Sequence, residues 1–417
     1  MRKKLLAMAA ALCMLLTGCS GEQVVIQQED RVEISLSWWG NDARTEYTIE
    51  GVKEFERLHP DIKVNISYSE WSGYEARNRI QMVSKTEADV MLVNFGWLSK
   101  FSEDGSGYYD IEKVADWFDL SNFEPAILEY GRRGGVLNAI PIAMNTETLY
   151  INKTLYNEYG LDVPETWDDL EAAAAVLSRD GIYAISGAAK SIWLYTITYA
   201  EQITGKPFLR EDGTLNFTAK ELQIMLEFYD RMVDEKVFPQ VEYYDRLNLE
   251  NRTYGGTVAW VSDAANYCSS TIEKGDEVVA APYTHTADTQ SGEGWYAKPA
   301  TLYAISRNTD HPEEAAMLLD FLLNDKSMAV LQGVEKGVPL SHSAREALLE
   351  VDMLQGIQYE ASLCMEENQN MGKMNSFVED STLIDMFIAS CNLVLFDKMT
   401  PEEAAQDLYR QIKETYQ

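Results

Sequence analysis

The sequence predicts a two-lobed α/β protein whose first lobe is built on an open parallel sheet. Three strand-like runs, 32–39, 62–68 and 89–95, are separated by segments long enough for crossover helices, which make neighbouring strands parallel. A chain of 417 residues is too long for one hydrophobic core, so we expect two lobes. Tryptophan closes or closely follows each run, at the edge where open parallel sheets bind ligands.

The first elements alternate in the order strand, helix, strand, helix, strand. Apolar and polar residues alternate in 32–39 and in 62–68, which is the period of a half-buried strand. The stretch between them carries Ile49, Val52 and Phe55 at helical spacing and is stopped by Pro60. A second helical stretch, 73–85, leads into the third run. This order is typical of the start of a doubly wound α/β lobe.

Later helices are predicted from their N-terminal signals. In a capping box, a threonine at the N-cap is followed three residues later by a carboxylate. The sequence contains three such pairs: Thr166 with Asp169, Thr218 with Glu221, and Thr400 with Glu403. Pro312 and Pro401 stand at first helical positions, where the missing N–H costs nothing. Residues 288–294 are predicted to form a turn-rich loop.

The N-terminal segment, 1–19, is predicted to be a lipoprotein signal peptide. A basic region at 2–4 precedes an apolar run, 5–16, that is too short for a bilayer anchor. Leu16-Thr17-Gly18-Cys19 matches the bacterial lipobox, so Cys19 is the expected lipidation site, and an ordinary signal peptide is the alternative. Residues 20–31 are polar and are expected to form a flexible tether. No later segment has the roughly eighteen apolar residues of a membrane span.

The charge and cysteine content of the chain limit the partners and the disulfides that are possible. The formal net charge of −32 repels nucleic acid, and no basic stripe compensates for it. Beyond the signal peptide only Cys268, Cys364 and Cys391 remain, without CxxC spacing, so at most one disulfide can form. We expect buried free thiols.

The usual catalytic signatures are absent from the sequence. None of the four histidines has metal-ligand spacing to another, and HExxH, GxSxG, P-loop and Rossmann glycine motifs do not occur. The 67 acidic residues allow many carboxylate pairs, so composition alone leaves a glycosidase open. We therefore predict no catalytic residue, no metal site and no cofactor.

Motifs spread in order over nearly the whole mature chain resemble family 1 of the extracellular solute-binding proteins, the binding components of ABC importers for sugars. They are Ser37-Trp38-Trp39-Gly40, His59-Pro60, Ala139-Ile140-Pro141-Ile142, Pro164-Glu165-Thr166-Trp167-Asp168, Gly255-Gly256-Thr257-Val258-Ala259-Trp260, Lys298-Pro299-Ala300 and Gly337-Val338-Pro339-Leu340. The resemblance implies the two-lobed fold of type II periplasmic binding proteins, with a hinge that the chain crosses several times. It implies an N-terminal lobe of 32–141 with 302–345 and a C-terminal lobe of 142–301 with 346–417.

The same resemblance implies the function. The protein would capture an oligosaccharide between the lobes, close around it by hinge motion and deliver it to a membrane permease. We expect a monomer that is lipid-anchored at the cell membrane, faces the extracellular or periplasmic side and does not bind nucleic acid. A lipoprotein glycosidase and a sugar-binding protein that feeds a membrane sensor are the alternatives.

Within the family, the pattern resembles the branch associated with oligogalacturonide uptake. Arg44 matches an arginine of that branch, but Thr45 replaces the histidine next to it. Another arginine, expected soon after the 140–142 motif, is also absent. Polyanionic ligands need cationic partners, because an unpaired buried carboxylate is costly. We therefore expect a neutral or weakly charged oligosaccharide, and oligogalacturonide is the alternative, with Arg44, Lys100 and Lys298 as its candidate clamps.

Sugar sites combine aromatic platforms with polar side chains that bond hydroxyls. The candidate ligand-binding residues follow the predicted strands or border the predicted crossovers: Trp39, Asn41, Asp42, Arg44, Trp71, Asn94, Trp97, Asn145, Trp193, Trp260, Asp263, Trp295, Tyr296 and Lys298. A core position is the alternative for each tryptophan, and helix capping is the alternative for Asp42. Trp38 shares the inward parity of Leu36 and is expected in the core, and Trp117 and Trp167 are expected to be structural.

Overall fold

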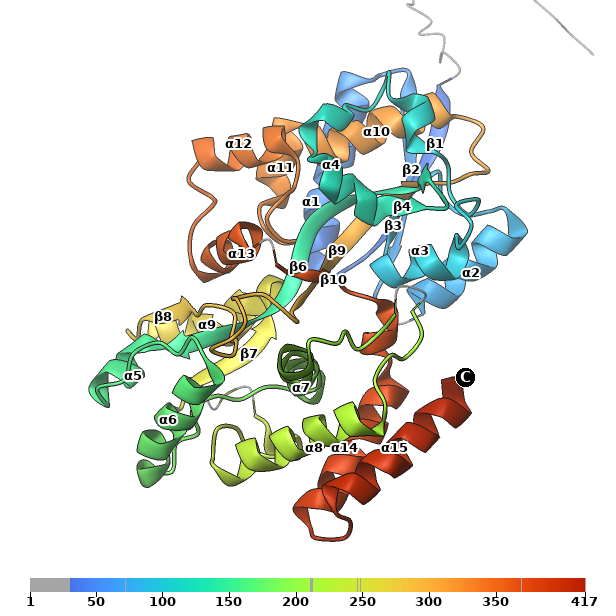
Figure 1. Ribbon diagram of the computed structural model, residues 1–417. Coiled ribbons are helices and arrows are strands. Elements are labelled where there is room, and N and C mark those ends of the chain that lie inside the picture. The colour runs from blue at the N-terminus through green and yellow to red at the C-terminus, as the bar shows by residue number, and fades with distance from the viewer. Residues whose placement is uncertain are drawn as a thin grey trace, which may run out of the picture.

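The computed structural model describes residues 31–71, 73–210, 213–245, 247, 249–368 and 370–416 (Figure 1). The predicted signal peptide, with Cys19, and residues 20–30 of the predicted tether lie outside the described residues. Within the described ranges, no helix is long and apolar enough to cross a membrane.

The predicted parallel opening is confirmed. Strands β1 (Val32–Trp39), β2 (Ile62–Ser69) and β3 (Val90–Val93) pair in parallel, with β1 between the other two. Helices α1 (Asp42–Leu58) and α2 (Tyr74–Ser84) make the crossovers. The third strand stops two residues before the predicted end, because the Asn94 side chain accepts from the Gly96 N–H and caps α3 (Phe95–Phe101).

The first lobe surrounds this end of the sheet. Its further elements are α4 (Pro125–Leu128), the hairpin of β4 (Arg132–Arg133) and β5 (Val136–Leu137), α10 (Pro312–Asn324), α11 (Lys326–Gln332) and α12 (His342–Glu350). Trp38 is fully buried here and stacks on Tyr68 at 5.1 Å between ring centroids, which confirms its core position. The core of this lobe takes its residues from 34–142 and 302–340.

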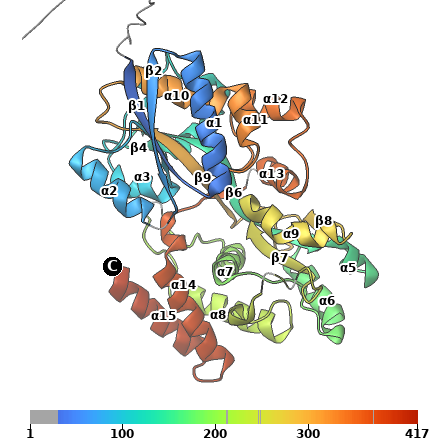
Figure 2. The same ribbon diagram turned by 180° about the vertical axis from the view of Figure 1, so that it is seen from behind.

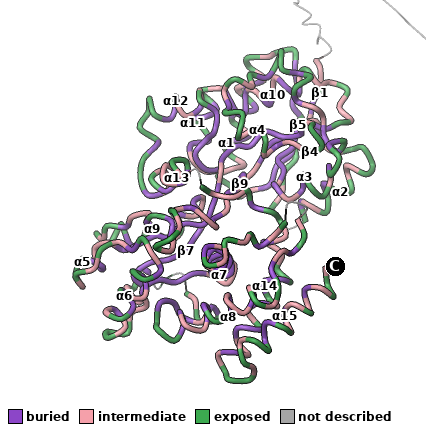
Figure 3. The backbone as a smooth tube through the Cα atoms, in the orientation of Figure 1, coloured by how far each residue is buried: buried purple, intermediate pink, exposed green. Residues whose placement is uncertain are grey.

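The second lobe is mostly helical. It contains β7 (Gly256–Trp260), β8 (Val278–Ala280), α5 (Lys153–Glu158), α6 (Trp167–Leu177), α7 (Ala189–Thr204), α8 (Ala219–Asp234), α9 (Ala264–Glu273), α13 (Ile357–Glu367), α14 (Ser381–Leu395) and α15 (Pro401–Tyr416). Its main core draws on 149–295 and 365–412, and α7 runs through the buried interior (Figure 3). The short 3₁₀ helices are η1 (Ile111–Val114), η2 (Leu120–Asn122), η3 (Glu129–Gly131), η4 (Ser178–Asp180), η5 (Val241–Tyr243), η7 (Val261–Asp263) and η8 (Ser376–Glu379).

Two long strands run from one lobe into the other, as the view from behind also shows (Figure 2). The first part of β6 (Ala139–Asn152) pairs with β9 (Tyr296–Ile305), and its second part pairs with β7 and β8. The register of β6 against β9 shifts at Pro141–Ala143 and again at Ala143–Met144. Strand β10 (Gly372–Lys373) adds a third connection beside β9.

The two-lobed α/β fold is thus confirmed. The two cores divide the chain near the register shift in β6, which supports the boundary at 141. We keep the predicted lobes, 32–141 with 302–345 and 142–301 with 346–417, as a proposal, although α12 continues in the first lobe to Glu350.

The predicted caps form with one exception. The three capping boxes at Thr166, Thr218 and Thr400 are present, each with reciprocal hydrogen bonds between the threonine and the carboxylate three residues later. Asp42 does not cap α1, since the Asn41 side chain accepts from the Arg44 N–H at 2.9 Å. The three cysteines of the described chain are free thiols, two of them buried and Cys364 half-buried.

Candidate functional site

The tryptophans that follow β1, β2 and β3 meet in one cluster at the carboxyl edge of the sheet. The Trp39 ring lies 5.0 Å from that of Trp71 and 5.5 Å from that of Trp97, and Trp71 and Trp97 stack at 5.7 Å with planes 12° apart. Trp39 and Trp97 are buried, whereas Trp71 is 48% exposed. The sequence therefore locates the cluster, but only Trp71 offers a large free aromatic surface.

Tyr74 completes this aromatic cluster and was missed by the sequence analysis. Its ring lies 5.2 Å from Trp39 and 5.8 Å from Trp97, and its hydroxyl is within 3.0 Å of the Ser37 hydroxyl. Burial raises the pKa of Tyr74 above its ordinary value. It stands three residues after Trp71 at the start of α2, a signal that helical spacing could have supplied.

The polar candidates beside this cluster are helix caps. The side-chain oxygens of Asn41 and Asn94 accept backbone N–H groups at the N-termini of α1 and α3. Asp42 is exposed in the first turn of α1, where a carboxylate complements the helix dipole. Lys100, one of the candidate clamps, pairs with Glu75 on the surface. The caps fix the orientation of the loops that carry the aromatic cluster.

Arg44 is engaged inside the protein instead of being presented to a ligand. Its Nε lies 3.0 Å from Oε2 of Glu335, its Nη2 donates to Oε1 at 3.0 Å, and its Nη1 donates to the Trp39 carbonyl at 3.1 Å. The Tyr47 hydroxyl donates to the same carboxylate at 2.8 Å. The guanidinium fork of Arg44 is thus already satisfied by Glu335, and its role as a ligand clamp stays a prediction.

A second cation lies next to this pair. Lys336 is fully buried, and its Nζ donates to the Tyr303 hydroxyl at 2.8 Å. Burial and the nearby Arg44 charge together lower the pKa of Lys336 to about 7. We refer to Arg44, Tyr47, Tyr303, Glu335 and Lys336 as the Glu335 cluster. It ties α1 to the 335–340 segment, whose Leu340 N–H donates to the Ile142 carbonyl in β6.

In the second lobe, Trp260 lies under two ammonium groups. The Nζ of Lys298 is 4.7 Å and that of Lys190 is 5.0 Å from the centre of its ring. Both lysines pair with the carboxylate of Glu379. Burial alone would raise the pKa of Glu379, but the two lysines outweigh it and hold the pKa below its ordinary value. Trp260 and Lys298 could be predicted from the sequence, whereas Lys190 and Glu379 could not, because they are distant in the chain.

Two further polar groups border this cluster in β6. The Asn145 side chain joins β6 to η7, since it donates to the Ser262 hydroxyl at 2.9 Å and accepts from the Ser262 N–H at 3.0 Å. Glu147 is buried and accepts from the Ser191 hydroxyl at 3.0 Å, while its Oε2 has no partner among the described residues. Burial raises the pKa of Glu147 to about 8. Asp263 is half-buried at the end of η7.

Trp193 and Trp295 are not part of an open surface. Both lie in the core of the second lobe, and their indole N–H groups donate to the carbonyls of Val378 and Thr284 at 2.8 and 3.0 Å. Apolar neighbours enclose both rings in this structure, and their contact with a ligand stays a prediction. Trp167 is likewise buried, as expected.

The two sides of the candidate site approach each other along one short segment. A Cβ built on Gly96 would lie 3.5 Å from the Cβ of Ser376, so the start of α3 meets the start of η8. Trp97 stands next to Gly96, and η8 ends at Glu379. The helix that carries Trp97 of the aromatic cluster therefore touches the 3₁₀ helix that carries Glu379, the partner of the two lysines over Trp260.

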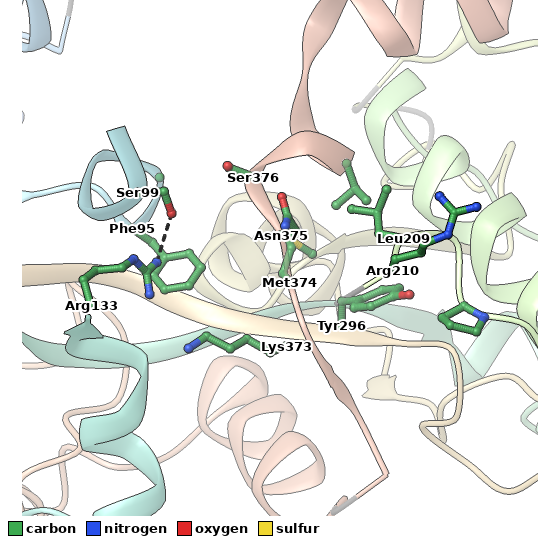
Figure 4. A pocket seen from close by; sticks show the side chains of 13 residues that line it. Phe95, Ser99, Arg133, Leu209, Arg210, Tyr296, Lys373, Met374, Asn375 and Ser376 are labelled. Atoms are coloured by element: carbon green, nitrogen blue, oxygen red, sulfur yellow. Dashed lines mark hydrogen bonds between the residues drawn. The ribbon is translucent and has the colours of Figure 1, made fainter. Parts of the chain in front are cut away.

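A cavity of about 430 Å³ opens at this boundary. Its walls include Phe95 and Arg133 from the first lobe, Arg210 from the second, and Tyr296 and Lys373 from β9 and β10 (Figure 4). Among the described residues, no group of histidine, cysteine or acidic side chains could hold a metal ion. Aromatic faces and polar groups from two lobes, joined by continuous strands, define a two-lobed binding protein.

Comparison with known proteins gives the family. Residues 41–329 match the model of the bacterial extracellular solute-binding proteins. The chain belongs to this family, as its sequence motifs indicated. The family consists of binding proteins, whose known members include carriers for sugars.

Solved structures agree with this assignment. A periplasmic oligogalacturonide-binding protein of Yersinia enterocolitica, in complex with saturated digalacturonic acid, is 28% identical, with a TM-score of 0.77 over 92% of this chain and 98% of its own. A periplasmic solute-binding protein of Pectobacterium atrosepticum is 26% identical, with a TM-score of 0.82 over 93% of this chain and 100% of its own. A de novo designed cysteine esterase is 29% identical, with a TM-score of 0.85 over 92% and 98%.

Proposed function

We propose that this protein is the substrate-binding lipoprotein of an ABC carbohydrate importer and captures an oligosaccharide between its lobes. The observation that carries the proposal is the pair of aromatic surfaces on the two sides of the boundary. Trp71 presents a half-exposed ring on the first lobe, and Trp260 presents a ring between Lys190 and Lys298 on the second. Sugar rings have flat C–H faces that pack on such rings and hydroxyls that bond to the polar rim.

Transport follows from closure. An oligosaccharide that contacts both lobes stabilises the closed arrangement over the open one, and the closed form would dock on membrane permease subunits. The strands β6 and β9 and the β10 connection are the segments about which the lobes would move. No covalent step on the sugar belongs to this proposal.

Calorimetric titration with a panel of neutral and acidic oligosaccharides, followed by chromatography of the mixtures, tests the proposal. We expect saturable binding of at least one oligosaccharide and full recovery of the uncleaved ligand. Cleavage products would favour the glycosidase alternative instead, and absence of binding across the panel would contradict the capture of an oligosaccharide.

The lipid anchor is a separate part of the proposal and rests on the lipobox at Leu16-Thr17-Gly18-Cys19. Labelling of producing cells with a fatty-acid analogue should mark the wild-type protein and leave a Cys19→Ser variant unmarked. Equal labelling of both proteins would contradict acylation at Cys19.

The charge of the ligand depends on which cations are free. Arg44 pairs with Glu335, Lys298 with Glu379 and Lys100 with Glu75, so all three cations that the sequence singled out already have a carboxylate partner. These pairings fit the expectation of a neutral or weakly charged sugar. The cavity beside Phe95, however, is lined by Arg133 and Lys373, for which the described residues provide no carboxylate in an ion pair.

A further inference from the structure

Arg133 and Lys373 share one wall of the interlobe cavity. Arg133 ends β4, and Lys373 lies in β10, so a hairpin of the first lobe and a connection between the lobes bring them together. Their charged groups lie 5.5 and 5.8 Å from the centre of the Phe95 ring. Figure 4 shows the two side chains reaching toward the same space beside Phe95.

Neither cation has a carboxylate partner among the described residues. Arg133 donates to the Arg132 carbonyl at 2.8 Å and to the Ser99 hydroxyl at 3.2 Å, and its Nε is buried without a partner. Lys373 donates to the Glu129 carbonyl oxygen of the backbone at 3.2 Å. The Glu129 carboxylate accepts a hydrogen bond from Arg132 at 2.8 Å, so it is paired with Arg132 and forms no ion pair with Lys373.

This arrangement is unusual for so acidic a chain. The sequence carries 67 acidic residues against 35 basic ones, and Arg132, one residue away, pairs with two glutamates. Burial lowers the pKa of Arg133 and of Lys373, and for Lys373 the Arg133 charge lowers the pKa further while the Glu129 carboxylate partly raises it. Two like charges in a partly buried wall repel each other. An anion bound between them would attract both and so offset that repulsion.

The opposite wall of the cavity contributes a third cation. Arg210 of the second lobe also bonds neutral groups, the Leu215 carbonyl at 2.5 Å and the Thr214 hydroxyl at 3.1 Å. Tyr296 adds an aromatic face between the two walls, and its hydroxyl donates to Glu201 behind it. Burial raises the pKa of Glu201 to about 7, which weakens its competition with an anion. Among the residues that the structure describes, no carboxylate lines the cavity.

We propose that this cavity is an anion subsite in which Arg133 and Lys373 hold a carboxylate of an acidic oligosaccharide bound between the lobes. The proposal rests on the proposed function and names the class of its ligand. Arginine offers a planar fork to the two oxygens, and lysine adds a compact charge. The ligand that we propose is therefore an acidic oligosaccharide, in place of the neutral one that the sequence favours.

The test is calorimetry of the full chain with an oligogalacturonate trimer and a neutral galactose trimer of the same linkage, at two salt concentrations. Arg133→Gln and Lys373→Gln are each expected to weaken binding of the acidic trimer about tenfold and to reduce its salt dependence. Lys113→Gln removes one equal charge from an exposed position in the first lobe and should leave binding unchanged. Thermal unfolding verifies that each variant is folded.

The outcomes separate the subsite from the broader function. Unchanged binding of the acidic trimer in both folded variants, or an equal loss for the neutral trimer, would overturn the subsite while leaving sugar capture intact. A third titration uses inorganic phosphate. Phosphate binding that is lost in Arg133→Gln, without binding of either trimer, would identify a site for a free anion and overturn both the carboxylate assignment and the proposed function. Absence of all binding would also overturn both.

Discussion

Replacing Glu335 with glutamine is expected to lower the free energy of unfolding by about 2–4 kcal/mol, because it leaves the mostly buried Arg44 guanidinium without its carboxylate partner. The side chains of Arg44 and Glu335 are only 14% and 24% exposed and make a two-pronged ion pair. Lys336 is buried beside them. Chemical denaturation monitored by circular dichroism, with its slope checked for constancy, measures the change.

A matched control lies on the nearby helices α11 and α12. Glu346 pairs with Lys326 at 2.9 Å, but their side chains are 64% and 52% exposed. Glu346→Gln should therefore leave the free energy of unfolding nearly unchanged. Similar losses in Glu335→Gln and Glu346→Gln would show that the Glu335 cluster contributes no more than a surface pair.

The effect of Glu335→Gln should also depend on pH. Burial would raise the pKa of Glu335, but hydrogen bonds from Arg44 and Tyr47 outweigh it and hold the folded-state pKa below its ordinary value. The stabilisation is thus fully present above the unfolded-state pKa of about 4.3 and is lost as the pH falls through the folded-state value. The difference between wild type and variant should shrink below about pH 4.

Replacing Trp71 with alanine is expected to weaken oligosaccharide binding about 10- to 100-fold, with only a small loss of stability. Trp71 is the half-exposed member of the aromatic cluster, backed by the buried rings of Trp39 and Trp97. Large aromatic residues on a rigid support commonly dominate binding free energy, and this range corresponds to about 1.4–2.8 kcal/mol. Calorimetry with the best ligand of the panel measures it.

Trp117 supplies the control for this variant. It is also an exposed tryptophan of the first lobe, but it lies between η1 and η2, away from the aromatic cluster. Trp117→Ala should retain wild-type affinity. If Trp71→Ala binds as tightly as wild type, the aromatic cluster does not contact the ligand.

The local elements could be predicted because their signals lie within short stretches of sequence. The alternation in β1 and β2, the three capping boxes and the inward parity of Trp38 all depend on neighbours within a few residues. The meeting of Trp39, Trp71 and Trp97 also followed, since parallel strands end at one edge. Strand β3 was overestimated because the sequence does not distinguish a last strand residue from the cap at Asn94.

The polar part of the site depends on long-range partners and could not be predicted. From the sequence, Arg44 was a candidate for binding a ligand, but it pairs with Glu335, which is 291 residues away in the chain. Lys190 and Glu379 meet at Trp260 from separate segments, and Arg133 meets Lys373 across the lobe boundary. Trp193 and Trp295 lie in the core, a position that the sequence could not distinguish from the cleft, because a tryptophan in a helix or after a loop can face either one.

Small-angle X-ray scattering of the full chain, with and without a saturating oligosaccharide from the panel, tests the central claim most directly. If the ligand sits between the lobes and draws them together, the radius of gyration must fall on binding and must stay unchanged with a sugar that does not bind. Tight binding with an unchanged radius of gyration would contradict capture by closure of the two lobes.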